Sequence, residues 1–186
     1  GNNRAIIEEN ASVDWLSGSL GGKVTIVYPM SVLKGVNSRT TVTSVALANG
    51  PTWKEEGAKV FHSAPYTYSK VVSKGVSLNG GTSVYRGLVY VREGARYARS
   101  SVSCESLILD DKSKAYTIPH EQVFEDTATV THEAYTGRIG EDKLFYLRSR
   151  GLSEEEARSL IVLGYFHDIM VNLPVEYVSI FNRAIE

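Results

Sequence analysis

Cysteine is nearly absent from the sequence, which contains a single one, Cys104. One thiol cannot form an internal disulfide, and this suits a reducing compartment such as the cytoplasm. Long apolar runs are also missing, because none approaches the roughly 18–20 residues that span a bilayer. We therefore expect a soluble, cytoplasmic protein with no membrane segment.

An excess of charge of one sign is missing as well. The 20 Lys and Arg residues nearly balance the 21 Asp and Glu residues, and the formal net charge is −1. Binding to a phosphate backbone depends on an excess of clustered basic groups. The composition therefore argues against a nucleic-acid-binding protein.

Common catalytic motifs are missing too. The segment from Gly18 to Lys23 looks like a phosphate-binding loop, but position 17 is Ser and Val24 stands where a Mg²⁺-binding hydroxyl is needed. There is no G-x-S-x-G, H-E-x-x-H, G-x-G-x-x-G or paired-cysteine motif. The sequence therefore predicts no self-contained catalytic site.

The chain before residue 137 is rich in Ser, Thr, Val, Gly and Tyr and contains short alternating runs. Such alternation with β-branched residues predicts strands. Turn residues separate the runs at Asn49-Gly50-Pro51, Asn79-Gly80-Gly81 and Asp110-Asp111. Many short strands with fairly regular turns favour a β-solenoid or a β-sandwich, and periodicity alone does not choose between them.

A weak internal repeat is visible within this β region. Glu56-Gly57-Ala58-Lys59 resembles Glu93-Gly94-Ala95-Arg96, and each segment precedes a strand-like run. Repeats of this kind are typical of stacked β architectures. We expect each segment to lie at a turn.

After residue 137 the periodicity becomes helical, which predicts a β domain over 1–137 and a helical domain over 138–186. A first helix over 141–150 should end at Gly151, and Ser153 with Glu156 fits a capping box for a second helix. Pro174 suits the first turn of a last helix. The face expected to be buried on the second helix consists of Ala157, Leu160, Ile161, Gly164 and Tyr165.

Cys104 and the pair His132-Glu133 are the candidate functional residues. A free cysteine is most often a small buried hydrophobe. His132 has the same parity as Ala128 and Val130, so in an unbroken strand it would point inward with them. Glu133 would then face the opposite way, as an ordinary solvated carboxylate.

Several motifs resemble the SufB/SufD family of iron–sulfur cluster assembly proteins and occur in family order from about residue 70 to the C-terminus. They are the glycine-rich segment 73–89 with Tyr85-Arg86-Gly87, the block C-E-S-L-I-L-D-D-K-S from Cys104 with Thr117-Ile118-Pro119, the sequence T-H-E-A from Thr131, and the segment 144–157. The resemblance implies a right-handed parallel β-helix followed by a small helical domain. It also implies that the N-terminal region of the family is truncated or missing here.

What the resemblance implies for function is a non-catalytic scaffold. Two SufB/SufD-type subunits would pair, and each would hold one SufC-type ATPase through its helical domain. The family's scaffold sites correspond to Cys104 and Glu133, with His132 beside them. SufD-type members usually have glycine after the histidine, so Cys104 with Glu133 favours a SufB-like chain.

These residues suggest a transient iron–sulfur cluster as the cargo. Clusters are commonly held by four thiolates, sometimes with histidine substituting. One Cys, one His and one Glu per chain cannot enclose a cluster, so we expect it to form where two subunits meet. Cys104 and Glu133 would bind iron there, with His132 as a further ligand.

Two other functions remain open from the sequence. A β-helical polysaccharide lyase or hydrolase would need converging carboxylates or a basic catalytic residue in a groove, and would use surface aromatics such as the 11 tyrosines. An accessory subunit of an ABC-type ATPase system without a cluster role is the third possibility. A scaffold should be inert without its ATPase, whereas an enzyme should turn over substrate alone.

Overall fold

The computed structural model describes residues 3–171, 173 and 175–185, so the predicted helix-starting Pro174 lies outside the described residues. The described chain begins with twelve strands. They are β1 (Arg4–Ile7), β2 (Ser12–Ser19), β3 (Val24–Val27), β4 (Met30–Leu33), β5 (Arg39–Asn49), β6 (Trp53–Glu56), β7 (Lys59–His62), β8 (Tyr68–Leu78), β9 (Thr82–Val91), β10 (Arg99–Ile108), β11 (Lys114–Val123) and β12 (Thr129–Arg138).

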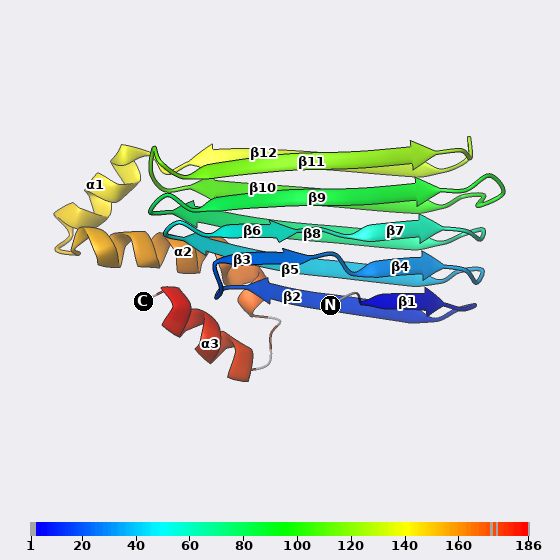
Figure 1. The fold of residues 1–186 in the computed structure, drawn as a ribbon, viewed down its shortest axis with the longest axis horizontal. Helices are drawn as coiled ribbons and strands as arrows, with labels where there is room; N and C mark the ends of the chain where they lie inside the picture. The colour runs from blue at the N-terminus through cyan, green and yellow to red at the C-terminus, as the bar shows by residue number, and fades with distance from the viewer. Residues whose placement is uncertain (1–2, 172, 174, 186) are drawn as a thin grey trace.

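The strands form two parallel sheets that face each other along the length of the molecule (Figure 1). One sheet has the order β1-β4-β7-β9-β6-β3, with β11 beside β9, and the other has the order β12-β10-β8-β5-β2. The chain alternates between the two sheets and so makes a solenoid of about 5 turns. Because every strand pairing is parallel, the prediction of a β-solenoid is confirmed and the sandwich alternative is wrong.

Register between successive turns keeps equivalent side chains in rows. Arg39, Tyr68, Arg99 and Thr129 lie side by side on four neighbouring strands. Since side chains alternate between the two faces of a strand, every second residue points into the space between the sheets. That space holds one apolar cluster that includes Val42, Val60, Val71, Tyr85, Val89, Val102 and Cys104.

The turn predictions are confirmed at Asn49, Asn79 and Asp110, but the two segments of the proposed repeat are not equivalent. Gly94 lies at the corner between β9 and β10, whereas Gly57 interrupts one sheet between β6 and β7. A Cβ atom on Gly57 would lie 1.7 Å from the carbonyl oxygen of Arg86 on the neighbouring strand. Close backbone approach explains this glycine.

Three helices follow in the described part of the chain: α1 (Glu141–Ser149), α2 (Glu154–Met170) and α3 (Val175–Ile185). They gather at one end of the strands (Figure 1). The predicted capping box is present, because the Ser153 side chain accepts from the Glu156 amide and the Glu156 carboxylate accepts from the Ser153 amide. Gly151 has a φ of 97°, as expected for a residue that ends a helix.

The predicted buried face of α2 is only partly correct. Ala157 is buried, but Leu160 is 50 % exposed and Gly164 is exposed. The face of α2 that packs on the solenoid instead consists of Val162, Phe166, Ile169 and Met170. It packs against Val45, Leu47 and Val76 of the sheet. Since α2 is apolar around much of its circumference, its sequence pattern did not determine which face packs on the sheet.

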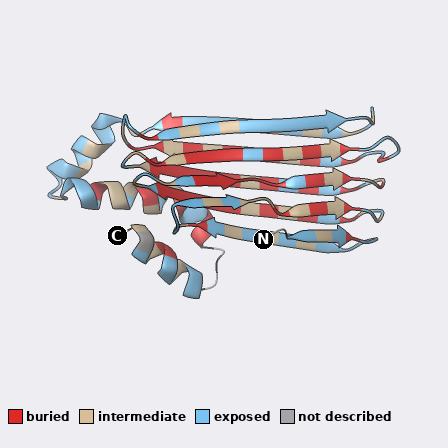
Figure 2. Cartoon of the chain, in the orientation of Figure 1, coloured by how far each residue is buried: buried red, intermediate tan, exposed pale blue. Residues whose placement is uncertain are grey.

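The last turn of the stack differs from its middle. The inner positions of β5, β8 and β10 are buried, whereas β11 and β12 are mostly exposed (Figure 2). In the described structure β11 pairs with β9 and β12 pairs with β10, and no other strand continues either sheet. We call the turn formed by β11 and β12 the last rung.

No helix in the described part of the chain is long and apolar enough to cross a membrane.

Candidate functional site at the last rung of the solenoid

Cys104 lies on β10, one turn before the last rung, and points into the space between the sheets. Its relative exposure is 1 %, and it belongs to the interior apolar cluster with Val102 and Tyr85. The expectation of a buried cysteine is therefore confirmed. Burial alone would make this thiol an inert packing group, so its polar neighbours decide whether it can do more.

His132 is the closest polar neighbour of this thiol. It lies on β12, and its Nε2 atom is 2.8 Å from the Sγ atom of Cys104. The imidazole is mostly buried, with 14 % of the side chain exposed, and it points inward, as its shared parity with Val130 predicted. The structure therefore brings two of the predicted site residues into direct contact across neighbouring turns.

Glu121 is a third member of this group that the sequence reasoning missed. It lies on β11, and its Oε1 atom is 3.3 Å from the Nδ1 atom of His132. Glu121 lies beside the buried Val89 in the sheet register, and this places it on the inner face. Pro119 hid the signal, because proline argues against a regular strand except at a sheet edge, and β11 is such an edge.

Burial controls the protonation of the Cys104 thiol. Removal from water raises its pKa to about 12, and the nearby Glu121 carboxylate contributes in the same direction. Burial likewise raises the pKa of the neighbouring Tyr85 hydroxyl. Both groups are therefore protonated at neutral pH in this conformation.

Glu133 is not part of this group. It lies beside Ser103 in the register of β12 and β10, on the strand face opposite to His132, and it is exposed. Its carboxylate therefore projects from the outer face of the sheet, while Cys104 and His132 face the interior. The structure brings Cys104 and His132 together and leaves Glu133 on the other side of the same strand.

The group is chemically incomplete within one chain. Among the described residues, no set of three or more His, Cys, Asp or Glu side chains is arranged to hold a metal ion. A thiol and an imidazole at 2.8 Å supply one soft and one borderline donor for a metal such as iron. The remaining donors would have to come from outside this arrangement.

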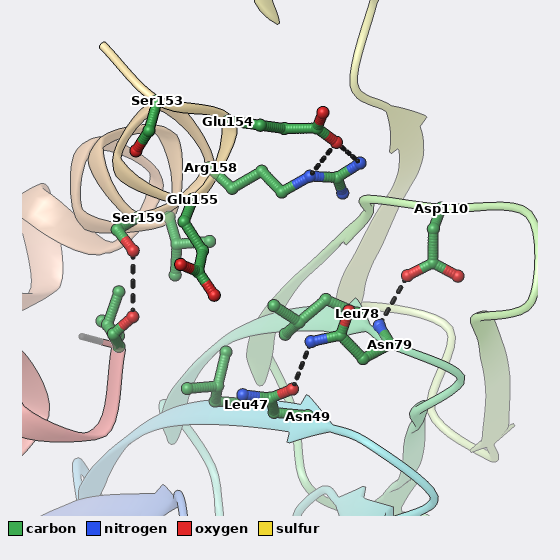
Figure 3. Close-up of a pocket in the computed structure, with 12 residues that line it drawn as sticks. Leu47, Asn49, Leu78, Asn79, Asp110, Ser153, Glu154, Glu155, Arg158 and Ser159 are labelled. Carbon is green, nitrogen blue, oxygen red and sulfur yellow. Dashed lines mark hydrogen bonds and ion pairs between the residues drawn. The ribbon is translucent and has the colours of Figure 1, made fainter.

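A pocket of about 520 Å³ lies between the start of α2 and the strand ends, away from Cys104 and His132 (Figure 3). Its polar groups are largely occupied within the chain. Arg158 donates to the Glu154 carboxylate and to the carbonyl of Leu109, and the Asn79 side chain donates to Asn49. The Asp110 carboxylate accepts from the backbone N–H of Asn79. The polar groups of this pocket therefore hold helix and sheet together.

An apolar groove lies between α2 and α3. It is lined by residues that include Leu160, Leu163, Val175 and Val178. Leu160 and Val175 remain exposed, and exposed apolar surface of this kind is typical of a protein-binding site. The helices therefore pack on the solenoid with one face and leave a second apolar surface uncovered.

Comparison with protein families gives a match over residues 1–165 to the model described as SUF system FeS cluster assembly, SufBD core domain. The chain is also 43 % identical over 183 residues to the iron–sulfur cluster assembly protein SufB of Bacillus subtilis. The same identity and length apply to iron–sulfur cluster assembly SufBD family proteins of Staphylococcus epidermidis and Staphylococcus haemolyticus. Each alignment covers 98 % of this chain and 39 % of the relative, so the chain spans about two fifths of these proteins.

Proposed function

Because the chain belongs to the SufBD family of iron–sulfur cluster assembly proteins, we propose that it is a SufB-like scaffold on which a nascent cluster forms at a subunit interface. The contact between Cys104 and His132 at the last rung carries this proposal. The chain itself catalyses no reaction in this account. The iron and sulfide are its cargo, held transiently and passed on.

The open last rung supports a partner at the site. An unpaired strand edge is a ready surface for pairing with another chain. The edges of β11 and β12 border the Cys104–His132 contact, so a second SufB/SufD-type subunit docked there would cover it. That subunit would also supply the donors that one chain lacks.

The residues of this chain would act in a defined order. The Cys104 thiol must lose its proton before it binds iron, and the nearby Nε2 atom of His132 is placed to accept it. Cys104 is too buried to meet iron in the present arrangement, so the last rung must shift before cargo enters. Glu133 would contribute a hard oxygen ligand only after a change in β12, or to a site shared with the partner.

The apolar groove between α2 and α3 supports a second part of the proposal, that a SufC-type ATPase binds the helices. ATP hydrolysis in that separate subunit would supply the energy for the shift at the last rung. The Lys74 ammonium couples helix to sheet, since it lies 2.8 Å from Asp168 on α2 and 3.7 Å from Glu105 on β10. Glu105 directly follows Cys104, so movement of α2 has a short route to the thiol.

The central experiment measures iron and acid-labile sulfide in the assembled complex of the full-length protein with its ATPase. Cys104→Ser should abolish both while the complex stays intact. The double variant Cys104→Ser/Ser106→Cys keeps one buried inward thiol two residues along the same strand and should not restore cluster formation. Normal iron and sulfide in Cys104→Ser would overturn the scaffold proposal.

A separate experiment tests the ATPase half of the proposal. The chain is mixed with a SufC-type ATPase, and complex formation and ATPase rate are measured together. Leu160→Asp in the groove should weaken binding, whereas Phe145→Asp, at an exposed position on α1 outside the groove, should not. Equal binding by both variants would show that the ATPase does not bind in the groove.

A further inference from the structure

We propose that Glu121 is a positioning residue for the cluster site: it holds the His132 ring so that Nε2 faces the Cys104 sulfur. This inference rests on the proposed scaffold function, and it assigns a role to a residue on the opposite sheet from Cys104 and His132. The observation behind it is a continuous line of contacts, Glu121 Oε1 to His132 Nδ1 at 3.3 Å and His132 Nε2 to Cys104 Sγ at 2.8 Å.

The two ring nitrogens of a neutral histidine have different roles. One carries a proton and donates, and the other presents a lone pair, and the hydrogen bond made by the first nitrogen decides which is which. A carboxylate can only accept, so the approach of Glu121 Oε1 to 3.3 Å from Nδ1 of His132 favours a proton on that nitrogen. Nε2 is then left with its lone pair directed at Cys104, ready to accept the thiol proton or to bind a metal.

Glu121 fits this role better than the role of a metal ligand. It lies against the Nδ1 side of the imidazole, whereas Cys104 lies against the Nε2 side, so the ring separates the carboxylate from the thiol. This agrees with the absence of a three-residue metal group among the described residues. A carboxylate that orients a metal-binding histidine from behind is a recurrent arrangement in metalloproteins.

The surroundings of the ring support a fixed orientation. The Tyr85 ring approaches the His132 ring edge to face, with centroids 6.2 Å apart and an interplanar angle of 68°. Tyr85 is itself buried and in the core of the solenoid. Tyr85 therefore restricts the plane of the imidazole, and Glu121 restricts its rotation and its tautomer.

The first test observes the tautomer directly, by two-dimensional NMR of the chain with ¹⁵N-labelled histidine. Wild-type His132 should carry its proton on Nδ1. Glu121→Ala should lose this preference, and Glu121→Gln should retain it, because its side-chain oxygen still accepts a hydrogen bond. His62, which lies two strands away from β11 and is bound by two other hydroxyls, is an internal reference that should not change.

The second test measures the apparent affinity of the assembled complex for Fe²⁺. Glu121→Ala should weaken it by roughly 10–100-fold, as loss of an orienting carboxylate usually does. Glu93→Ala, which removes a carboxylate from an exposed corner, should leave it unchanged.

The inference is overturned if wild-type His132 carries its proton on Nε2, or if folded Glu121→Ala keeps the Nδ1 tautomer. Wild-type iron affinity in that variant would also overturn it. The two NMR results do not depend on Cys104, and iron affinity that is unchanged in Glu121→Ala removes only the role of Glu121, so all three leave the scaffold proposal standing. Conversely, a normal cluster in Cys104→Ser would end that proposal without changing the NMR result.

Discussion

His62 and His132 both point into the solenoid, yet their partners differ. His62 is fully buried, and its Nδ1 and Nε2 atoms lie 2.8 Å and 2.9 Å from the hydroxyls of Thr67 and Ser69. His132 lies in the open last rung between a thiol and a carboxylate. The first histidine completes the core, and the second connects two groups that can exchange a proton or bind a metal.

The comparison shows how one repeating architecture provides both stability and chemistry. In the closed turns every inner side chain has neighbours on two sides, so polar groups there are satisfied and fixed. In the described structure no further turn covers one side of the last rung, and its inner side chains keep part of their surface open. A functional group placed there remains accessible to a partner while it still rests on a rigid stack.

The largest expected effect is a difference in how much stability each histidine contributes to the fold. His62→Ala should lower the free energy of unfolding by about 3–4 kcal/mol, because it opens a cavity and removes one hydrogen-bond partner from each of two buried hydroxyls. His132→Ala should lower it less, by about 1–2 kcal/mol, because 14 % of this side chain is exposed and the residue lies at the edge of its sheet. Urea unfolding followed by circular dichroism measures both, and similar losses would break the comparison.

The pH dependence of stability should also come from the closed turns. Burial lowers the pKa of His62 from 6.5 to about 4, so between these values the unfolded chain binds a proton that the folded chain does not. The free energy of unfolding should therefore fall as the pH is lowered from 6.5 to about 4, and the part of this loss due to His62 should be about 3 kcal/mol.

The measurement for this prediction compares wild type with His62→Gln in urea unfolding at pH 7 and pH 4. Taking the difference between the two proteins removes the contribution of other groups, including the buried Glu56, whose pKa burial raises. An equal loss of stability in both proteins would show that His62 does not control this window.

A smaller contrast is expected for a matched valine pair. Val71 lies in a closed turn and is buried, whereas Val130 lies in the last rung and is half-buried. Truncation to alanine at Val71 should lower the free energy of unfolding by about 2 kcal/mol, because apolar burial is lost and a cavity remains. At Val130 it should cost about 0.5–1 kcal/mol in the isolated chain. A larger cost at Val130 would mean that the last rung is more tightly packed than its exposure indicates.

The smallest effect is expected on the outer surface of the last rung. Arg138 and Asp111 form an ion pair at 2.6 Å between exposed side chains. Exposed pairs of this kind contribute about 0–1 kcal/mol and are screened by salt. Arg138→Ala should therefore change the unfolding free energy by no more than about 0.5 kcal/mol, and a loss above 1 kcal/mol at high salt would assign it a structural role.

Much of the fold could be predicted because its signals are local. Alternation, turn residues and the capping box at Ser153 each depend on a few neighbouring residues, and the structure confirms them. The stacking of turns was supported by resemblance rather than by periodicity. The buried face of α2 was predicted wrongly at Leu160 and Gly164, because an apolar helix can pack with several faces and tertiary contacts choose among them.

The site could be predicted only in part. Parity placed His132 inward, but its contact with Cys104 depends on the register between β10 and β12, which the sequence does not state. Glu121 comes from the other sheet, so no local pattern links it to His132. The role of Glu133 stays a prediction, since its outward position leaves it to a partner or to a rearranged strand.

The most direct test of the central claim compares the two histidines in the assembled complex of the full-length protein. Iron and acid-labile sulfide per complex are measured for His132→Gln and His62→Gln, with circular dichroism as the check on folding. We predict that His132→Gln loses most of the cluster while folded, and that folded His62→Gln retains it. Equal cluster content in the two folded variants would contradict the assignment of the last rung as the assembly site.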